Sequence, residues 1–265
     1  MKRFLSSIMT LLIVFVISSK SLYGEVKLPA IFGNNMVLQQ KTEASIWGIA
    51  AKNATVKVTT SWNNKSYSAR AGDDGKWKLK ISTPSAGGPY EVSISDGTTL
   101  KLNNVMIGEV WVCSGQSNME MPMKGFQNQP VEGSNEAIAT SSNPSIRLFT
   151  VKKASSLQPL DDFSGSWKNC EPENVSEFSA TAYYFGLMLY KALNVPIGLI
   201  NTSWGGTRIE PWMSEEGIKK FDFVKLPEKN QQGTLSPPTP TVLYNAMLRT
   251  IDRKTTRLHS SHRCT

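Results

Sequence analysis

Ser117 is the residue of this chain whose position most readily supports chemistry. It lies in the stretch VCSGQSN (112–118), directly after an almost continuous apolar run at 105–113. Such a run predicts a strand that is covered on both faces, so Ser117 stands just beyond the end of a buried strand. A serine hydroxyl becomes a nucleophile when a base removes its proton and N–H donors stabilise the oxyanion. The alternative is an ordinary turn in which a serine caps a helix.

A second buried strand is predicted to end nearby. Residues 178–193 have apolar side chains at helical spacing, and the Asn194 and Pro196 that follow favour a helix end. The apolar segment IGLINTS (197–203) then predicts a strand, which runs into the turn SWGG (203–206). A strand–helix–strand order predicts a parallel α/β sheet, in which functional groups gather at the carboxyl ends of the strands. We therefore expect Ser117 and this turn at the same edge of the sheet.

The N-terminal part of the chain has a different pattern. Apolar and polar residues alternate in four segments, at 54–60, 76–82, 90–95 and 98–104, with Asn-, Asp- and Gly-containing turns between them. This pattern predicts an antiparallel β-sandwich over 25–105, with one face of each sheet in water. The α/β part then starts at 106, and the proline-containing stretch 214–240 is predicted to be a surface loop.

Both ends of the chain are unusual. Residues 1–24 combine a basic start, an apolar core at 11–17 and small residues before 25, which is typical of a secretory signal peptide. The alternative is an uncleaved membrane anchor. Residues 252–265 read DRKTTRLHSSHRCT and resemble a translated sequencing-library adapter. We predict that this segment is non-native, the alternative being a genuine basic tail.

The basic character of the chain comes mostly from these ends. The whole chain carries 29 Lys and Arg against 21 Asp and Glu, but without 1–24 and 252–265 the numbers are 22 and 20. A nucleic-acid partner is therefore not expected. The three cysteines do not suggest a disulfide framework, and no Cys/His spacing suggests a metal site. Cys113 continues an apolar strand and is expected to be a small buried residue.

Several long motifs carry a resemblance to a known family. The stretch GEVWVCSGQSNMEMPM (108–123) resembles the nucleophile block of the sialate O-acetylesterase family, a group of SGNH/GDSL hydrolases. LPAIFGNNMVLQQ (28–40), NTSWGGTRIEPWMS (201–214) and LYNAM (243–247) are similar to the same family in the same order. The resemblance covers about residues 25–248. It implies an N-terminal antiparallel β-sandwich at 25–105, followed by an incomplete SGNH-type α/β/α esterase domain at 106–251.

The resemblance also implies roles for individual residues. Ser117 would be the nucleophile, with its own N–H in the oxyanion hole and a second N–H from Gly205 or Gly206. Gln116 and Asn118 would shape the turn and contact substrate. Arg208 could bind a substrate carboxylate because a guanidinium matches that geometry, or it could pair with Glu210 on the surface.

Three tryptophans of these motifs have two interpretations. Trp111, Trp204 and Trp212 could form the walls of a sugar site, but plain core packing is the simpler expectation because each indole buries a large area.

Two blocks that the family carries after the LYNAM stretch are not found in this chain. One supplies an oxyanion-hole Asn, and the other is an Asp-x-x-His block that supplies the base and its orienting acid. His259 and His262 lie in the adapter-like tail with no Asp two or three residues before either. We therefore expect a fragment that has the nucleophile, lacks the base and is inactive and prone to aggregate.

The function expected from these patterns is removal of O-acetyl groups from sialic acid through a serine acyl-enzyme, without a metal or other cofactor. The expected partner is an O-acetylated sugar, and the expected location is secreted or periplasmic, with no membrane attachment after signal cleavage. One alternative is an acetyl esterase for another glycan, such as xylan. The other is a non-catalytic carbohydrate-binding protein with the sandwich as its binding module.

Overall fold

The computed structural model describes residues 25–228, 237–254 and 263–264. The predicted signal peptide, part of the predicted loop at 229–236 and most of the predicted non-native tail lie outside the described residues. Both histidines, His259 and His262, are among the residues that are not described. The predictions made for these segments therefore stay predictions.

One large sheet holds most of the strands. Its order is β4 (Ser66–Arg70), β3 (Thr55–Thr60), β6 (Gly87–Ser95), β7 (Thr99–Gly115), β10 (Ile197–Ser203), β8 (Asn143–Thr150) and β9 (Trp167–Cys170). Two short strands, β1 (Val37–Gln39) and β11 (Arg263–Cys264), also pair with β7 in parallel. A separate antiparallel pair is formed by β2 (Glu43–Ile49) and β5 (Lys76–Ser82).

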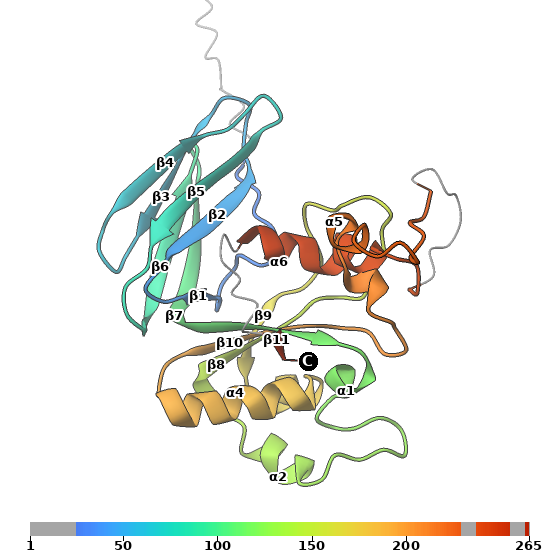
Figure 1. Cartoon of the computed structure of the whole chain (residues 1–265). Coiled ribbons are helices and arrows are strands. Elements are labelled where there is room, and N and C mark those ends of the chain that lie inside the picture. Colours follow the sequence, from blue (N-terminus) through green and yellow to red (C-terminus); the bar gives the residue numbers. More distant parts are fainter. Residues whose placement is uncertain (1–24, 229–236, 255–262, 265) are drawn as a thin grey trace, which may run out of the picture.

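Strand β7 belongs to both parts of the molecule. Its first half pairs antiparallel with β6, and its second half pairs parallel with β10, which in turn pairs parallel with β8 (Figure 1). The predicted α/β class with a mostly parallel central sheet is confirmed. The predicted boundary between 105 and 106 falls inside β7. The division into a sandwich domain and an esterase domain stays a prediction.

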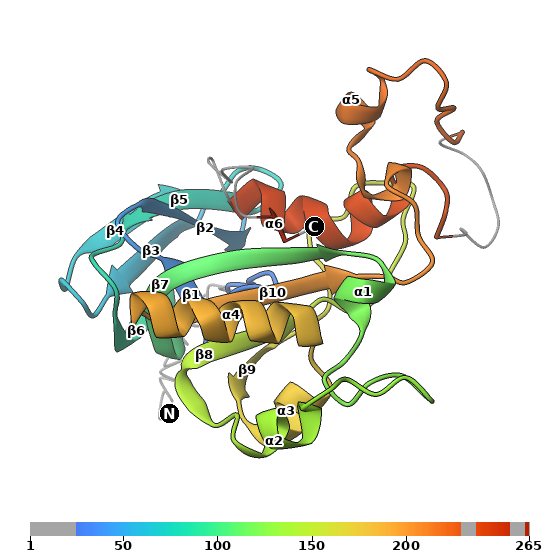
Figure 2. The same ribbon diagram turned by 60° about the horizontal axis from the view of Figure 1, so that its bottom comes forward.

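The parallel strands lie between helices, as the sequence pattern requires. Every residue of β10 is buried, which is expected of a strand covered on both faces. Helix α4 (Ala180–Leu193) covers one face, and α6 (Arg249–Lys254) lies over the other (Figures 1 and 2). The Ser179 side chain caps α4 by accepting from the Ala182 N–H at 3.1 Å, and Asn194 ends it in a left-handed conformation.

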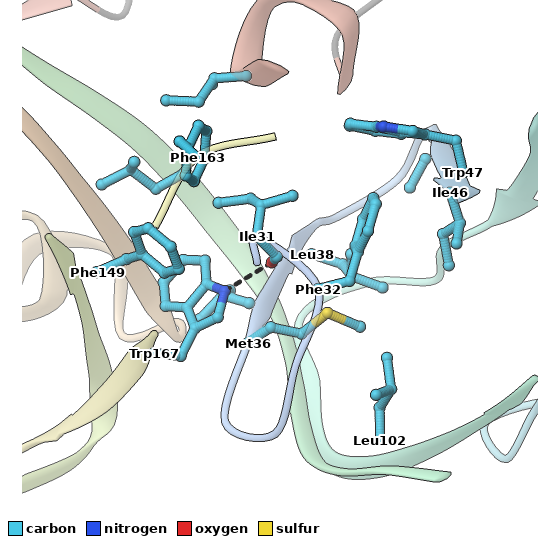
Figure 3. Packing of buried hydrophobic residues seen from close by; sticks show 14 of the residues in the cluster. Ile31, Phe32, Met36, Leu38, Ile46, Trp47, Leu102, Phe149, Phe163 and Trp167 are labelled. Atoms are coloured by element: carbon cyan, nitrogen blue, oxygen red, sulfur yellow. Dashed lines mark hydrogen bonds between the residues drawn. The ribbon is translucent and has the colours of Figure 1, made fainter. Parts of the chain in front are cut away.

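The segment 28–40 contributes several side chains to the hydrophobic core. Ile31 and Met36 are fully buried, and the Trp167 Nε1–H donates to the Ile31 carbonyl at 2.8 Å (Figure 3). The side chains of Gln39 and Gln40 donate to the two oxygens of Glu109 at 3.0 and 2.8 Å. These contacts attach the N-terminal segment to the strand that leads to Ser117.

The remaining helices are short. They are α1 (Ser117–Glu120), α2 (Ser134–Ala139), α3 (Pro172–Ser176), the 3₁₀-helix η1 (Glu210–Trp212), α5 (Glu215–Ile218) and the π-helix η2 (Tyr244–Leu248). Helix α5 lies inside the stretch 214–240, which was predicted to be a surface loop. Among the described residues, none of the helices has the length and apolar character needed to span a bilayer.

Candidate active site

Ser117 stands at the junction between β7 and α1. Strand β7 ends at Gly115, and α1 begins at Ser117, with Gln116 as its N-cap residue. The Gln116 carbonyl accepts from the N–H groups of Met119 and Glu120 at 3.0 and 2.9 Å, which closes the tight turn. Ser117 is half-buried, whereas Gln116 and Asn118 are exposed. The geometry therefore presents the hydroxyl at the carboxyl end of a buried strand, as predicted.

The turn after β10 lies against this junction. Ser203 is paired with Gly115 in the sheet, and the Trp204 N–H donates to the Gly115 carbonyl at 3.0 Å. A Cβ added at Gly205 would lie 3.5 Å from both the Cα and the Cβ of Ser117. The structure therefore brings together Ser117 and the turn that was predicted to supply the second oxyanion donor.

The two glycines of that turn differ in their hydrogen bonds. The Gly205 N–H donates to the Glu120 carboxylate, whose other oxygen binds the Lys153 ammonium. Gly206 has a positive φ of 74°, and within the described part of the chain its N–H has no acceptor. Of the two glycines, Gly206 is therefore the one whose N–H is not already used by a described acceptor. The assignment of the second donor stays a prediction.

Glu120 is a site residue that the sequence analysis did not identify. It belongs to the same motif as Ser117 and follows it by three residues, which places the two on neighbouring positions of one helical turn. That spacing was a usable signal. The partner Gly205, however, is 85 positions away in the chain, and no local pattern indicates that contact.

A pocket of about 1000 Å³ opens beside the nucleophile turn. Its walls come from the β7–α1 junction, the segment after β10, helix α4 and the C-terminal helices. The lining residues include Gln116, Asn118, Thr181, Thr207, Arg208, Trp212, Met213, Tyr244 and Leu248. Most of the wall is apolar, and a few polar groups converge on it, which is the usual composition of a small-molecule site.

Arg208 lines this pocket with an exposed side chain. One prediction had it paired with Glu210, but none of the ion pairs formed by the described residues involves Arg208. Arg208 therefore lines the pocket without a carboxylate partner among the described residues. A carboxylate of a bound ligand could accept two charge-assisted hydrogen bonds from the Arg208 guanidinium.

The three tryptophans of the motifs are in different environments. Trp111 packs edge-on against Phe185 of α4, with the ring centroids 4.9 Å apart. The Lys153 ammonium lies over the Trp204 ring in a cation–π contact, 5.5 Å from the ring centroid. Trp212 is buried, lines the pocket and donates from Nε1 to the Thr207 hydroxyl at 2.9 Å. Of the three, only Trp212 lines the pocket.

No described side chain is placed to act as a base on Ser117 in the manner of a histidine. The Tyr244 hydroxyl faces the pocket and donates to Asp252 at 2.7 Å. Burial, aided by the Asp252 carboxylate, raises the pKa of Tyr244 to about 12, so the phenol keeps its proton at neutral pH. In the described part of the chain, no three His, Cys, Asp or Glu side chains are grouped to hold a metal ion.

Cys170 is also unsuited to catalysis. It is buried, as is Cys113. Burial raises the pKa of the Cys170 thiol to about 12, and its sulfur donates to the Ser141 carbonyl at 3.1 Å. A protonated thiol is a weak nucleophile, so Cys170 is inert.

Comparisons with a family model, with individual proteins and with a solved structure all match this chain to acetylesterases. The sequence model of a family described as carbohydrate esterase, sialic acid-specific acetylesterase matches residues 107–258. This match contains the whole β7–α1 junction and the turn after β10. It also runs to residue 258, inside the segment that was predicted to be non-native.

Individual relatives match over much of the chain. The sialate O-acetylesterase of Homo sapiens is 34% identical over 234 residues, which are 81% of this chain and 44% of that protein. The Mus musculus protein of the same name is 36% identical over 204 residues, which are 70% of this chain and 37% of that protein. The chain thus spans less than half the length of these relatives.

A solved structure is also similar. The crystal structure of a carbohydrate acetylesterase from Xanthomonas citri superposes with a TM-score of 0.74 and 32% sequence identity. The similarity covers 87% of this chain and 49% of that one.

Proposed function

Since the chain belongs to the family of sialic acid-specific acetylesterases among the carbohydrate esterases, we propose that it carries the nucleophile and the substrate pocket of a serine esterase. The substrate would be an O-acetylated sialic acid. The observation that carries the proposal is the position of Ser117 at the end of β7, against the turn at Gly205 and beside a pocket that presents Arg208.

The proposed mechanism combines this arrangement with a base, which the described residues do not supply. A base takes the Ser117 proton while the serine oxygen attacks the acetyl carbonyl. The N–H groups of Ser117 and Gly206 stabilise the oxyanion of the tetrahedral intermediate. Loss of the sugar hydroxyl leaves an acetyl ester on Ser117. Water, deprotonated by the same base, then attacks this ester and releases acetate.

The choice of sugar rests on Arg208. A sialic acid carries a carboxylate, and an exposed guanidinium at the pocket can bind it in a bidentate manner. The second candidate is an acetyl esterase for another glycan, such as xylan. It is supported by the likeness to an enzyme that is called a carbohydrate acetylesterase without reference to sialic acid. A neutral glycan would leave Arg208 without a partner.

Two further parts of the proposal concern the chain rather than the pocket. Residues 1–24 would direct the protein to a secreted or periplasmic location, because they combine a basic start with a short apolar core. The chain as written would be a fragment without its catalytic base, because neither His259 nor His262 follows an Asp by two or three residues. Loss of a triad member costs several orders of magnitude in rate.

Chemical rescue tests the nucleophile in such a fragment. Acetate release from O-acetylated N-acetylneuraminic acid is measured for residues 25–265 and for Ser117→Ala, each with rising imidazole as an external base. We expect imidazole to raise release by the unaltered chain above that by Ser117→Ala. Equal release from both proteins at every imidazole concentration refutes Ser117 as the nucleophile. Fast Ser117-dependent release without imidazole instead contradicts only the missing-base proposal.

Substrate identity is tested with the same proteins. The release of acetate from acetylated xylan oligosaccharides is compared with that from acetylated N-acetylneuraminic acid. Preference for the sialic acid that is lost in Arg208→Met supports the first candidate. Preference for xylan that is unaffected by this substitution supports the second.

A further inference from the structure

A carboxylate lies beside the nucleophile without a part in the proposed mechanism. Glu120 is on α1, one turn after Ser117, and its two oxygens have separate partners. One binds the Lys153 ammonium, and the other accepts from the Gly205 N–H. Only 22% of the Glu120 side chain is exposed, less than for any other carboxylate in the ion pairs of the described residues. This pair is therefore screened less by solvent than the others.

The contact between Glu120 and Gly205 fixes the distance between helix α1 and the turn after β10. The turn after β10 is attached on one side of the nucleophile through the Trp204 N–H and the Gly115 carbonyl, 3.0 Å apart. On the other side it is attached through Gly205 and Glu120. A Cβ at Gly205 would come within 2.9 Å of the Glu120 carboxylate, so the backbone of the turn and the carboxylate lie in close contact. Along the chain, Ser117 lies between Gly115 and Glu120, the two residues to which the turn is attached.

The same turn continues into the wall of the pocket. The Thr207 hydroxyl donates to the Trp204 carbonyl at 2.6 Å and accepts from the Trp212 indole at 2.9 Å. Thr207, Trp212 and Arg208 all line the pocket. A displacement of Gly205 is therefore transmitted along the chain to the residues that would contact the sugar.

We propose that Glu120 is a positioning residue of this site. Its carboxylate holds the turn at Gly205 against the nucleophile helix, which sets the separation between Ser117 and the oxyanion donor of that turn. Lys153 neutralises the carboxylate, which would otherwise repel the negative charge that develops on the substrate oxygen. This inference rests on the proposed function of Ser117.

The test compares Glu120→Ala and Glu120→Gln with a matched control, Glu177→Ala. Glu177 also pairs with a lysine, at 2.7 Å, but its side chain is 64% exposed, and it does not line the pocket beside Ser117. Glutamine keeps an oxygen that can accept from Gly205 and loses the charge, so it is the conservative variant and retains the fold if alanine does not. The readouts are hydrogen exchange at the Gly205 amide, and kcat and KM for imidazole-supported acetate release.

We expect Glu120→Ala to speed exchange at Gly205 by about tenfold or more. We also expect it to lower kcat by about 10- to 100-fold with little change in KM, since small displacements of catalytic groups have effects of this size. Glu120→Gln should lie between alanine and the unaltered chain, and Glu177→Ala should match the unaltered chain in both readouts.

Unchanged exchange at Gly205 in Glu120→Ala overturns the inference, and so does a rise in KM at constant kcat, which would indicate a role in substrate binding. Failure of the proposed function has a different signature, because Ser117→Ala then releases acetate as fast as the unaltered chain. In that case the Gly205 exchange rate still decides whether Glu120 holds the turn.

Discussion

Gly108 is the position at which the packing of β7, the strand that leads to Ser117, can be tested most directly. It lies in β7, and a Cβ added there would meet the Pro196 carbonyl oxygen at 1.9 Å and its carbon at 2.7 Å. Both are backbone atoms of the residue directly before β10, so no flexible side chain can move aside. For Gly108→Ala, the two segments must separate by about 1 Å to reach the shortest contact that real Cβ atoms show.

The cost of this separation can be worked from the contacts. The Glu109 N–H donates to the same Pro196 carbonyl at 2.9 Å, so moving the segments apart weakens or breaks this bond. A lost backbone hydrogen bond costs about 1 kcal/mol or more, and overpacking a core costs about 1–3 kcal/mol. We expect Gly108→Ala to lower the free energy of unfolding by about 3 kcal/mol and the Tm by about 10 °C.

The assay is guanidinium chloride unfolding followed by tryptophan fluorescence, with Gly33→Ala as the matched control. An added Cβ at Gly33 meets nothing within 4 Å, so that variant should remain within about 0.5 kcal/mol of the unaltered chain. The reasoning is refuted if Gly108→Ala is as stable as Gly33→Ala. Equal and large losses in both variants would also refute it, because the effect would then not depend on the Pro196 contact.

Two other predictions concern charge. Arg208→Met should weaken binding of N-acetylneuraminic acid by about tenfold, the lower range for a charge-assisted contact at an exposed site. It should leave binding of neutral N-acetylglucosamine unchanged in calorimetry, with the exposed Arg70→Met as control; equal losses for both sugars would contradict a carboxylate contact. The pKa of Cys170 and of Tyr183 is raised to about 12, in both cases chiefly by burial. The folded chain therefore keeps protons that the unfolded chain releases above pH 9 to 10, so the unfolding free energy should be constant below pH 9 and fall towards pH 12. Denaturation midpoints across this range check the sign, and a midpoint that rises with pH would show that these two groups do not dominate.

Local features of the fold were predictable because they depend on neighbouring residues. Apolar spacing at 178–193, followed by Asn194 and Pro196, was enough to predict a helix and its end, and α4 has these limits to within two residues. The continuous apolar character of 105–113 and 197–203 was enough to predict two buried strands. Because strand order in α/β sheets follows general rules, the meeting of Ser117 with the turn after β10 also followed.

The extent of β7 was beyond such reasoning. An alternating pattern at 98–104 and a continuous apolar run at 105–113 read as two strands in two domains, yet one strand carries both. Its first half has β6 as antiparallel neighbour, and its second half has β10 as parallel neighbour. The change of pattern marks a change of neighbours and not a chain break, and periodicity reports burial without identifying the neighbour.

By itself, the sequence determined on which edge of the sheet Ser117 lies, since strand ends and turns are encoded locally. The role of Ser117 as nucleophile is what the family resemblance implies. Only the tertiary structure decided that Glu120 accepts from the Gly205 N–H, that Arg208 lines the pocket, and that the Trp167 indole donates to the Ile31 carbonyl. These contacts join residues far apart in the chain, and one-residue changes in strand register would exchange them for others. Which of these contacts form depends on the packing of the whole core, and a short stretch of sequence does not specify that packing.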